Sequence, residues 1–386
     1  MVLRGNWNYP TTIKAGAGRL TELPGLCRQH GIQRPLVITD PGLAALPMTK
    51  RLLDLCSDAG LLTGFFSGVK ANPTLANVEA GIDALQVGEH DGVIAFGGGS
   101  ALDAAKAVAL AARQDYPLFD FEDVGDNWTR VDADRVAPCI AIPTTAGTGS
   151  EVGRAAVITD TKAQLKRLIF HPRMLPVAVI LDPELTIALP PGLTAATGMD
   201  ALSHNLEAYC APGFHPLADG IALEGMRLVQ HHLPTAVAEG DNLGARMHML
   251  AASSMGATAF QKGLGAMHAL AHPLGAVFDA HHGMLNAILM PYVLAANQSA
   301  VGERLSHLAR WLDLPTHTPT AVIDWVLALR ERLAIPHTLA ALGIDQTQLE
   351  RIGTMAVADP SAATNPIPFS AREYTELARR AVIGLL

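Results

Sequence analysis

The sequence is poor in charge, in clustered basic residues and in long apolar runs. Charged residues make up 17% of its 386 positions, and the net charge is −8. Lys and Arg form no cluster longer than a dipeptide. A nucleic-acid-binding surface needs a basic stripe that neutralises phosphates, so the charge argues against this class of function. No apolar run approaches the roughly 18 residues of a membrane-spanning helix. We therefore expect neither a nucleic-acid partner nor a membrane protein.

Cysteine is also scarce, and it does not occur in pairs. The four cysteines, Cys27, Cys56, Cys139 and Cys210, lie far apart and form no C-x-x-C motif. In a chain of this length we expect them to be reduced and buried, as in a reducing compartment. The first ten residues, MVLRGNWNYP, contain no apolar segment typical of a signal peptide. These observations predict a cytoplasmic protein.

The residues that are abundant predict a large, well-buried enzyme of two parts. Hydrophobic residues make up 49% of the chain. Up to about residue 188, short apolar strands (35–40, 92–100, 138–152 and 177–185) alternate with helical segments, which predicts a parallel sheet covered on both faces. After the Pro190-Pro191 pair, helical patterns rich in Ala and Leu continue to the end. We predict an α/β domain over residues 1–188 and an all-helical domain over 189–386.

A glycine-rich turn in the first half has the layout of a phosphate site. In VIAFGGGSALDAAK (93–106) a strand leads through three glycines into a helix, with Ser100 as the expected N-cap. Backbone N–H groups and the helix dipole would face an anion there. The turn matches neither the dinucleotide fingerprint, because Leu102 replaces the third glycine, nor the P-loop, because no GK[ST] follows. A purely structural turn is the alternative.

Two other segments favour a dinucleotide at this turn. Asp40 ends the first strand, where a carboxylate can accept hydrogen bonds from ribose hydroxyls and repel a 2′-phosphate. PTTAGTGSE (143–151) places small and hydroxyl residues after another strand. Ligands of open parallel sheets bind at the carboxyl ends of strands, so all three segments can meet there. For Asp40 the alternative is an ordinary turn residue before Pro41.

Histidines with helical spacing in the second half suggest a metal site. Asp200 and His204 are four residues apart, His268 and His272 repeat this spacing, and His282 follows. One carboxylate and several imidazoles suit a divalent metal such as Fe²⁺ or Zn²⁺. The alternative for each histidine is burial with a hydrogen bond to a backbone carbonyl. A metal-dependent hydrolase would use a similar site, but it has no use for Asp40 or the glycine turn.

In several ordered motifs the sequence resembles the iron-containing (group III) alcohol dehydrogenases. The segments that match are PTTIKAGAG (10–18), VKANPT (69–74), GGGSALDAAK (97–106), IPTTAGTGSEV (142–152), TGMDALSHNLEAY (197–209) and HALAHPLGAVFDAHHG (268–283). The resemblance implies a Rossmann-like N-terminal domain and a helical C-terminal domain, as in dehydroquinate synthase, with the active site between them. It also implies NAD, Fe²⁺ or Zn²⁺, and a homodimer or higher homo-oligomer.

Residue by residue, the resemblance assigns three sets of roles. It places the metal ligands on Asp200, His204, His268 and His282, and a proton-relaying histidine on His272. The cofactor residues would be Asp40, Asn72, Gly97, Gly98, Gly99, Ser100, Asp103, Thr144, Thr145, Thr148, Lys166 and Leu181.

The implied activity is hydride transfer between NAD(H) and a short-chain primary alcohol or aldehyde. Arg154 lies just after the TGSE motif, and Lys262 lies shortly before His268. If either side chain faces the active site, it would favour a substrate with an anionic group. The alternative for both is an ion pair elsewhere. Glycerol dehydrogenase-like and maleylacetate reductase-like activities are alternatives within the same superfamily.

Overall fold

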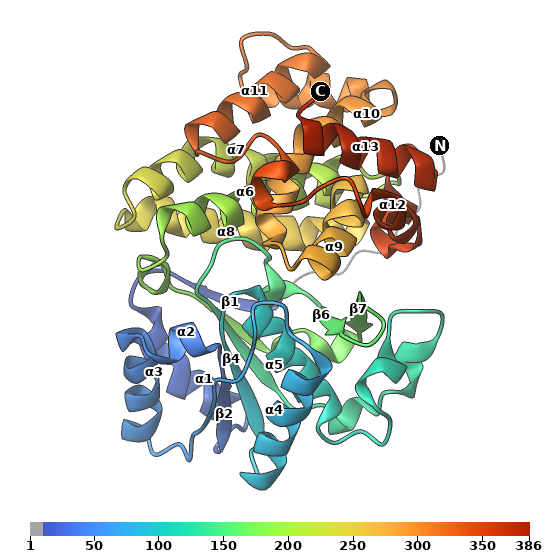
Figure 1. Cartoon of the computed structure of the whole chain (residues 1–386). Helices are drawn as coiled ribbons and strands as arrows, with labels where there is room; N and C mark the ends of the chain where they lie inside the picture. The colour runs from blue at the N-terminus through green and yellow to red at the C-terminus, as the bar shows by residue number, and fades with distance from the viewer. Residues whose placement is uncertain (1–10) are drawn as a thin grey trace. The chain divides into compact units, whose positions relative to one another are not determined.

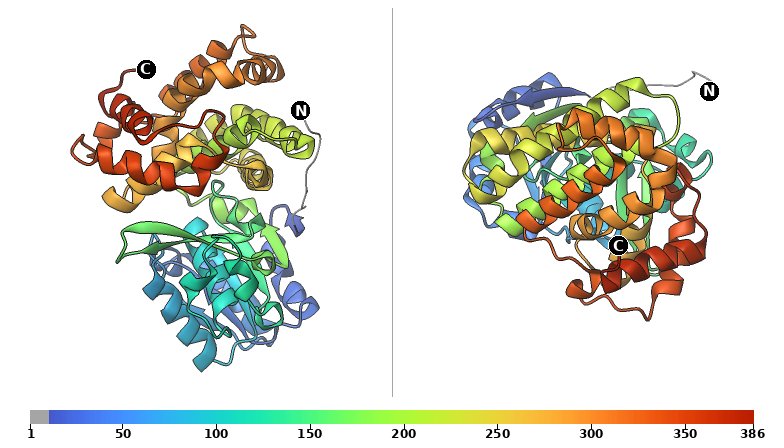
Figure 2. Two further views of the ribbon diagram at one scale, coloured as in Figure 1. Left: turned by 90° about the vertical axis from the view of Figure 1, so that its right-hand side faces the viewer. Right: turned by 90° about the horizontal axis from the view of Figure 1, so that it is seen from above.

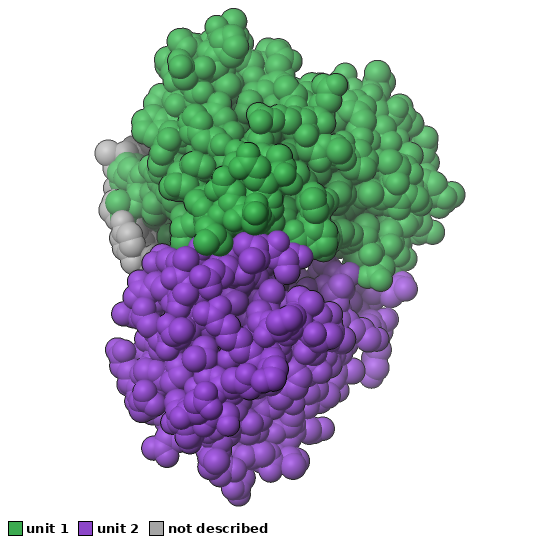
Figure 3. All heavy atoms as spheres, turned by 90° about the vertical axis from the view of Figure 1, so that its left-hand side faces the viewer, with its two compact units in different colours: residues 1–8, 146–148, 189–386 green, residues 9–145, 149–188 purple. Residues whose placement is uncertain are grey.

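The computed structural model describes residues 11–386, and within this range the chain forms two compact units (Figure 3). Residues 11–145 and 149–188 form an α/β unit, whereas residues 146–148 and 189–386 form a helical unit. The sequence places 146–148 in the first domain. The structure groups this short segment with the helices.

The α/β unit is built on a six-stranded sheet in which every strand pair is parallel (Figure 1). The strand order is β1-β8-β5-β4-β2-β3. The four inner strands are buried along their whole length, which explains why they appear in the sequence as continuous apolar runs. The strands are β1 (Thr12–Ala15), β2 (Pro35–Ile38), β3 (Gly64–Phe66), β4 (Gly92–Gly97), β5 (Cys139–Pro143) and β8 (Ala178–Leu181).

Helices cover both faces of this sheet. Alternate strand residues, among them Ile94, Phe96 and Ile140, pack with the apolar residues of α1 and α3 in one core. On the other face α5 packs against β4 and β5, and α4 packs against α5 (Figure 1). The helices are α1 (Leu23–Gln29), α2 (Pro41–Ala44), α3 (Pro47–Asp58), α4 (Leu75–Val87) and α5 (Gly99–Ala111).

An antiparallel ribbon that the sequence analysis did not predict completes the α/β unit. It pairs β6 (Ala155–Asp160) with β7 (Leu165–Phe170). Its side chains are mostly half-buried, and α5 packs against β6.

The helical unit contains no strand among its described residues, as predicted (Figure 2). Its central helix is α6, which is buried at nearly every position from Thr194 to Cys210 and packs against α7, α8 and α10. A helix buried on all sides accounts for the apolar sequence around Asp200 and His204. The helices are α6 (Pro191–Cys210), α7 (Pro216–Ala238), α8 (Leu243–Ala259), α9 (Ala266–Phe278), α10 (His282–Trp311), α11 (Pro319–Arg332), α12 (Leu349–Ala358) and α13 (Ala371–Ile383).

The four cysteines are free thiols buried in the two units, as expected. Burial raises the pKa of Cys139 and of Cys210 to about 12, so their reactive thiolate forms are scarce near neutral pH. Among residues 11–386, no helix is both long and apolar enough to span a membrane.

Candidate metal centre and cofactor loops

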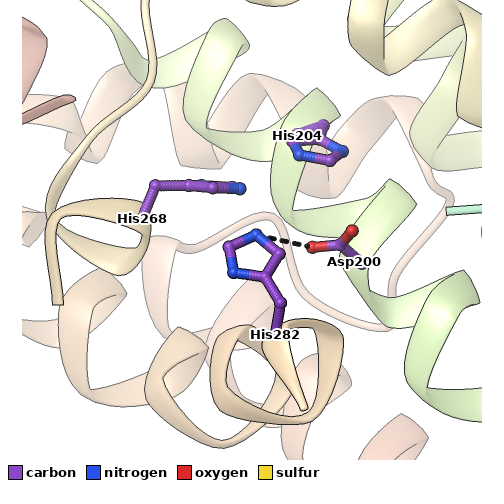
Figure 4. A group of neighbouring side chains, drawn as sticks. All are labelled: Asp200, His204, His268 and His282. Atoms are coloured by element: carbon purple, nitrogen blue, oxygen red, sulfur yellow. Dashed lines mark ion pairs between the residues drawn. The ribbon is translucent and has the colours of Figure 1, made fainter. Parts of the chain in front are cut away.

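The four side chains that the sequence analysis selects as metal ligands converge in the helical unit (Figure 4). Asp200 and His204 lie one turn apart on α6, His268 lies on the first turn of α9, and His282 begins α10. One donor atom from each residue lies within 4.8 Å of the others. His282 Nε2 is 3.7 Å from Asp200 Oδ1, the ion pair drawn in Figure 4.

Hydrogen bonds to two of these histidines determine which ring nitrogen carries a lone pair. His268 Nδ1 is 2.7 Å from Glu207 Oε2, and His204 Nδ1 is 3.3 Å from the carbonyl oxygen of Gly147. A carboxylate and a carbonyl only accept, so each Nδ1 must donate its hydrogen. In the neutral form of each ring the lone pair is therefore on Nε2, and this is the form in which imidazole binds a metal.

Asn286 shows that the cluster has more lone pairs than the protein can satisfy. Its amide nitrogen lies 2.9 Å from Asp200 Oδ1, 3.1 Å from His268 Nε2 and 3.2 Å from His282 Nε2. An amide group has two hydrogens, so it cannot donate to three acceptors at once. Asp200 and His268 are almost completely buried, and a cation would satisfy their donor atoms. The donor set therefore fits a divalent first-row metal.

Burial and neighbouring charges give two of these histidines opposite pKa shifts. Burial lowers the pKa of His204 to about 4, with Asp200 opposing the shift only in part, so its ring is neutral near pH 7. Burial would also lower the pKa of His268, but its hydrogen bond to the Glu207 carboxylate and that group's charge outweigh burial and raise it. The site thus contains one firmly neutral imidazole and one that is electrostatically coupled to a buried carboxylate.

Glycines allow the helices that carry the ligands to approach closely. A methyl group at Gly283 would stand 2.5 Å from the carbonyl oxygen of Ala196 and 3.1 Å from Asp200 Cβ. A methyl group at Gly256 on α8 would stand 2.9 Å from His204 Cβ. Both distances are shorter than ordinary contacts, so the site requires glycine at these positions.

His272 lies beside the cluster and pairs with a half-buried carboxylate, that of Asp359. Its ring stacks on His282 with centroids 5.4 Å apart, and its Nδ1 is 2.8 Å from Asp359 Oδ2. Burial alone would raise the pKa of Asp359, but the charge and hydrogen bond of His272 and hydrogen bonds from Ser361 hold it below the usual value. The sequence analysis predicts a proton-relay role for His272, and its position next to the donor cluster is compatible with that role.

Comparison with known proteins places this geometry in a family. The model of the iron-containing alcohol dehydrogenases matches residues 10–183, and that of the Fe-containing alcohol dehydrogenase family C-terminal domain matches residues 194–382. The chain belongs to the iron-containing alcohol dehydrogenase family. It is therefore a metal-dependent oxidoreductase of the alcohol dehydrogenase and aldehyde reductase class, whose members are NAD-dependent and bind iron.

Three similar proteins span nearly the whole chain. It is 38% identical over 379 residues to the 4-hydroxybutyrate dehydrogenase of Cupriavidus necator, covering 96% of this chain and 97% of that relative. The solved structure of a 1,3-propanediol oxidoreductase matches with a TM-score of 0.91 and 32% identity, covering 98% of this chain and 100% of that one. The sulfoacetaldehyde reductase of Bifidobacterium kashiwanohense, solved in complex with NAD⁺, matches with a TM-score of 0.88 and 29% identity, covering 98% and 99%.

The predicted pyrophosphate turn lies at the carboxyl end of β4. Gly97 has φ 147°, and a methyl group there would stand 2.7 Å from Ala101 Cβ, so this position requires glycine. The helix begins at Gly99 with Gly98 as N-cap, so the prediction of Ser100 as N-cap is wrong. Ser100 lies inside the first turn, where its hydroxyl donates to the Ala71 carbonyl.

Asp40, Thr144 and Thr145 lie around the same turn. The Asp40 carboxylate caps α2 by accepting from Leu43 N at 3.0 Å, and one of its oxygens would stand 3.6 Å from a methyl group at Gly97. Thr144 N donates to the Gly97 carbonyl at 2.9 Å, and Thr145 side-chain atoms border Gly98. The structure thus brings together the three segments on which the dinucleotide prediction rests.

The remaining predicted cofactor residues fall in different surroundings. Lys166 Nζ donates to Asn72 Oδ1 at 3.1 Å, so these two residues lie together. Asp103 accepts from Ser150 Oγ at 2.5 Å and from Val157 N at 2.9 Å, and it pairs with the buried Lys106 at 3.3 Å.

These contacts give Asp103 a structural role, because it anchors the loop after β5 and the start of the ribbon. Leu181 is buried at the end of β8, with 2% of its surface exposed. Thr148 belongs to the short segment that packs with the helical unit.

The two cationic side chains that were predicted to bind the substrate lie in different surroundings. Lys262 is buried and donates to Asp219 Oδ1 at 2.7 Å and to the Tyr209 carbonyl at 3.1 Å. This is the ion-pair alternative, so the assignment of Lys262 to a substrate is wrong. The half-buried Arg154 instead places its guanidinium over the ring of Phe170, 5.5 Å from the centroid.

Sequence reasoning missed three residues that organise the site. Glu207, Asn286 and Asp359 each contact a predicted functional histidine, from 4 to 87 residues away along the chain. Glu207 and Asn286 lie inside or next to the histidine motifs, one helical turn from a ligand, and this spacing was the signal that could have identified them. Asp359 carries no such local signal.

Proposed function

We propose that this enzyme interconverts short ω-hydroxy acids and the matching aldehydes with NAD(H). The observation that carries the metal-dependent activity is the convergence of one carboxylate and three imidazoles within 4.8 Å, with two of the imidazole rings oriented by hydrogen bonds. Asp200, His204, His268 and His282 would hold a divalent metal, which we propose to be iron, with zinc as the alternative. When bound, the metal supplies a Lewis acid for the substrate oxygen, and the nicotinamide supplies or accepts the hydride.

The protein's own groups bind the cofactor and handle the proton. The N–H groups at Gly98, Gly99 and Ser100 open α5 and would bind the pyrophosphate. Asp40, beside this turn, would accept hydrogen bonds from ribose hydroxyls and disfavour NADP(H). His272 donates through Nδ1 to Asp359, which leaves Nε2 available to hold a proton in exchange with the substrate hydroxyl.

The names of two relatives and one side chain of this chain support the proposed substrate class. The names 4-hydroxybutyrate dehydrogenase and sulfoacetaldehyde reductase both denote substrates with an anionic group. In this chain, Arg154 could hold such a group through two parallel hydrogen bonds. A plain alcohol or diol is the second candidate, favoured by the likeness to 1,3-propanediol oxidoreductase.

A paired comparison of two aldehydes tests the substrate class. Succinic semialdehyde and butyraldehyde have the same carbon chain, but only the first carries a carboxylate. We expect the wild type, assayed with NADH, to have the higher kcat/KM on succinic semialdehyde. Arg154→Ala should raise the KM for succinic semialdehyde about tenfold or more, which corresponds to the loss of one charged hydrogen-bond pair. The KM for butyraldehyde should stay unchanged.

Arg173→Ala is the matched control, because it removes an exposed arginine of the same unit. It should change neither aldehyde's KM. Equal effects of Arg154→Ala on both aldehydes, or a wild-type preference for butyraldehyde, would favour a general short-chain alcohol dehydrogenase.

Two further features of the proposal concern the protein in its cell. We place the enzyme in the cytoplasm, in keeping with its free, buried thiols. We also propose a homo-oligomer, for which light scattering coupled to size-exclusion chromatography is the direct test.

A further inference from the structure

Glu207 is a buried carboxylate whose hydrogen bonds all come from the start of α9. It lies on α6 one turn beyond His204, with 4% of its surface exposed. Its oxygens accept from Gly265 N at 2.9 Å, Met267 N at 2.7 Å and His268 Nδ1 at 2.7 Å. A buried carboxylate is costly unless such donors satisfy it, so this side chain holds α6 and α9 together.

The contact with His268 fixes the chemical form of that ring. Because the carboxylate only accepts, Nδ1 must carry a hydrogen, and in the neutral ring Nε2 then keeps the lone pair. His268 Nε2 faces the Asn286 amide, 3.1 Å away, in the donor cluster. Donation of the Nδ1 hydrogen to a carboxylate also makes the opposite nitrogen of an imidazole more basic, which strengthens its bond to a metal.

A second side chain caps the same helix without touching a histidine. Asn365 Oδ1 accepts from Ala266 N at 3.0 Å, between the two backbone groups that Glu207 binds. A methyl group at Gly265 would stand 2.9 Å from both Glu207 Oε1 and Asn365 Oδ1, so the two acceptors close tightly over the helix start. Glu207 and Asn365 therefore share the capping of α9, but only Glu207 orients the ring.

We propose that Glu207 is a positioning residue for the metal centre, which sets metal affinity by holding His268 in its Nδ1–H form. The proposal rests on the metal site of the proposed function. It concerns affinity for the ion and requires no knowledge of the substrate.

The test compares zinc affinity in two variants of the full-length protein. Glu207→Gln keeps the shape but replaces one acceptor oxygen with an NH₂ group, which would favour the wrong ring form of His268. We expect metal-free Glu207→Gln to bind Zn²⁺ about 10- to 100-fold more weakly than wild type, in competition with a chromogenic chelator. Asn365→Ala, the matched control, should lower the Tm of the metal-free protein but leave zinc affinity unchanged.

Two results would overturn the proposal. Glu207→Gln could bind Zn²⁺ as tightly as wild type, or Asn365→Ala could lose as much affinity as Glu207→Gln, which would make Glu207 only a helix cap. Wild-type zinc binding is a separate control, because a wild type without affinity would refute the metal site of the proposed function itself.

A measurement on the wild type keeps the proposal testable even when a variant does not fold. Histidine labelled with ¹⁵N distinguishes the two neutral ring forms by chemical shift. His268, assigned by the signals missing in His268→Gln, should be in the Nδ1–H form in the metal-free protein. The Nε2–H form would refute the proposal.

Discussion

Gly283→Ala adds only one methyl group, but it should displace His282 from the other metal ligands. Gly283 follows His282 at the start of α10 and faces α6, where the new methyl carbon would stand 2.5 Å from the Ala196 carbonyl oxygen. An ordinary C···O contact is about 3.3 Å, so the two helices must separate locally by about 0.8 Å. Metal sites keep their ligand distances within about 0.2 Å, so His282 and Asp200 could no longer bind the same ion in the native geometry.

The expected effects are large enough to measure in two ways. Overpacking of this kind costs about 1–3 kcal/mol of stability, and displaced ligand geometry should lower metal affinity by at least about tenfold. Metal content per chain is measured by elemental analysis after dialysis, and stability by thermal unfolding of the metal-free protein. The control is Gly302→Ala on the same helix, where a methyl group would be 3.6 Å from Pro319 Cγ, an ordinary contact.

Gly302→Ala should keep the metal and stabilise the protein by about 0.5–1 kcal/mol, because alanine is the better helix former. If Gly283→Ala matched Gly302→Ala in metal content and Tm, the close contact between α6 and α10 would not determine the geometry of the site.

Three further predictions address the relay, the cofactor and pH. His272→Ala should retain the metal and lower kcat by about 10²- to 10⁴-fold; loss of metal would make His272 a ligand. Asp40→Gly should narrow the preference for NADH over NADPH in kcat/KM, because it removes a charge that repels the 2′-phosphate, and an unchanged ratio would contradict this role. Burial and the neighbouring His248 lower the pKa of His232 from 6.5. The unfolded chain therefore binds the proton more readily, so the free energy of unfolding falls as pH drops below 6.5. His232→Gln should flatten this decline in urea unfolding between about pH 7.5 and 5.5, and an unchanged slope would refute the assignment.

The sequence predicted the elements whose signal is local. Continuous apolar strands followed by helices identified the parallel sheet, because strands buried on both faces leave no room for polar alternation. The β6–β7 ribbon gave no such signal. Its turn, TKAQ (161–164), contains neither glycine nor asparagine, and the left-handed residue in it is Gln164 with φ 53°.

In the candidate site, too, the sequence predicted the residues that a local pattern reveals and missed those that meet only through the packing of distant segments. The spacing of Asp200 and His204 is itself enough to place two donors on one face of a helix. Asp359 could not be found, because it meets His272 only through the packing of a distant segment. Lys262 was misassigned because its partner Asp219 lies 43 residues earlier, and an isolated lysine gives no sign of such a pair.

The segment Ala146–Thr148 supplies a part of the metal site that lies outside the helical half of the sequence. It lies between strands of the α/β unit in the sequence, yet it belongs to the helical unit and its Gly147 carbonyl accepts from His204. A methyl group at Gly147 would stand 2.9 Å from Thr197 Cβ, so this fit is also tight. Residues 189–386 contain all four donors but lack the acceptor that orients one of them. A chain built from residues 189–386 alone would therefore carry all four donors but lack the hydrogen bond that orients His204.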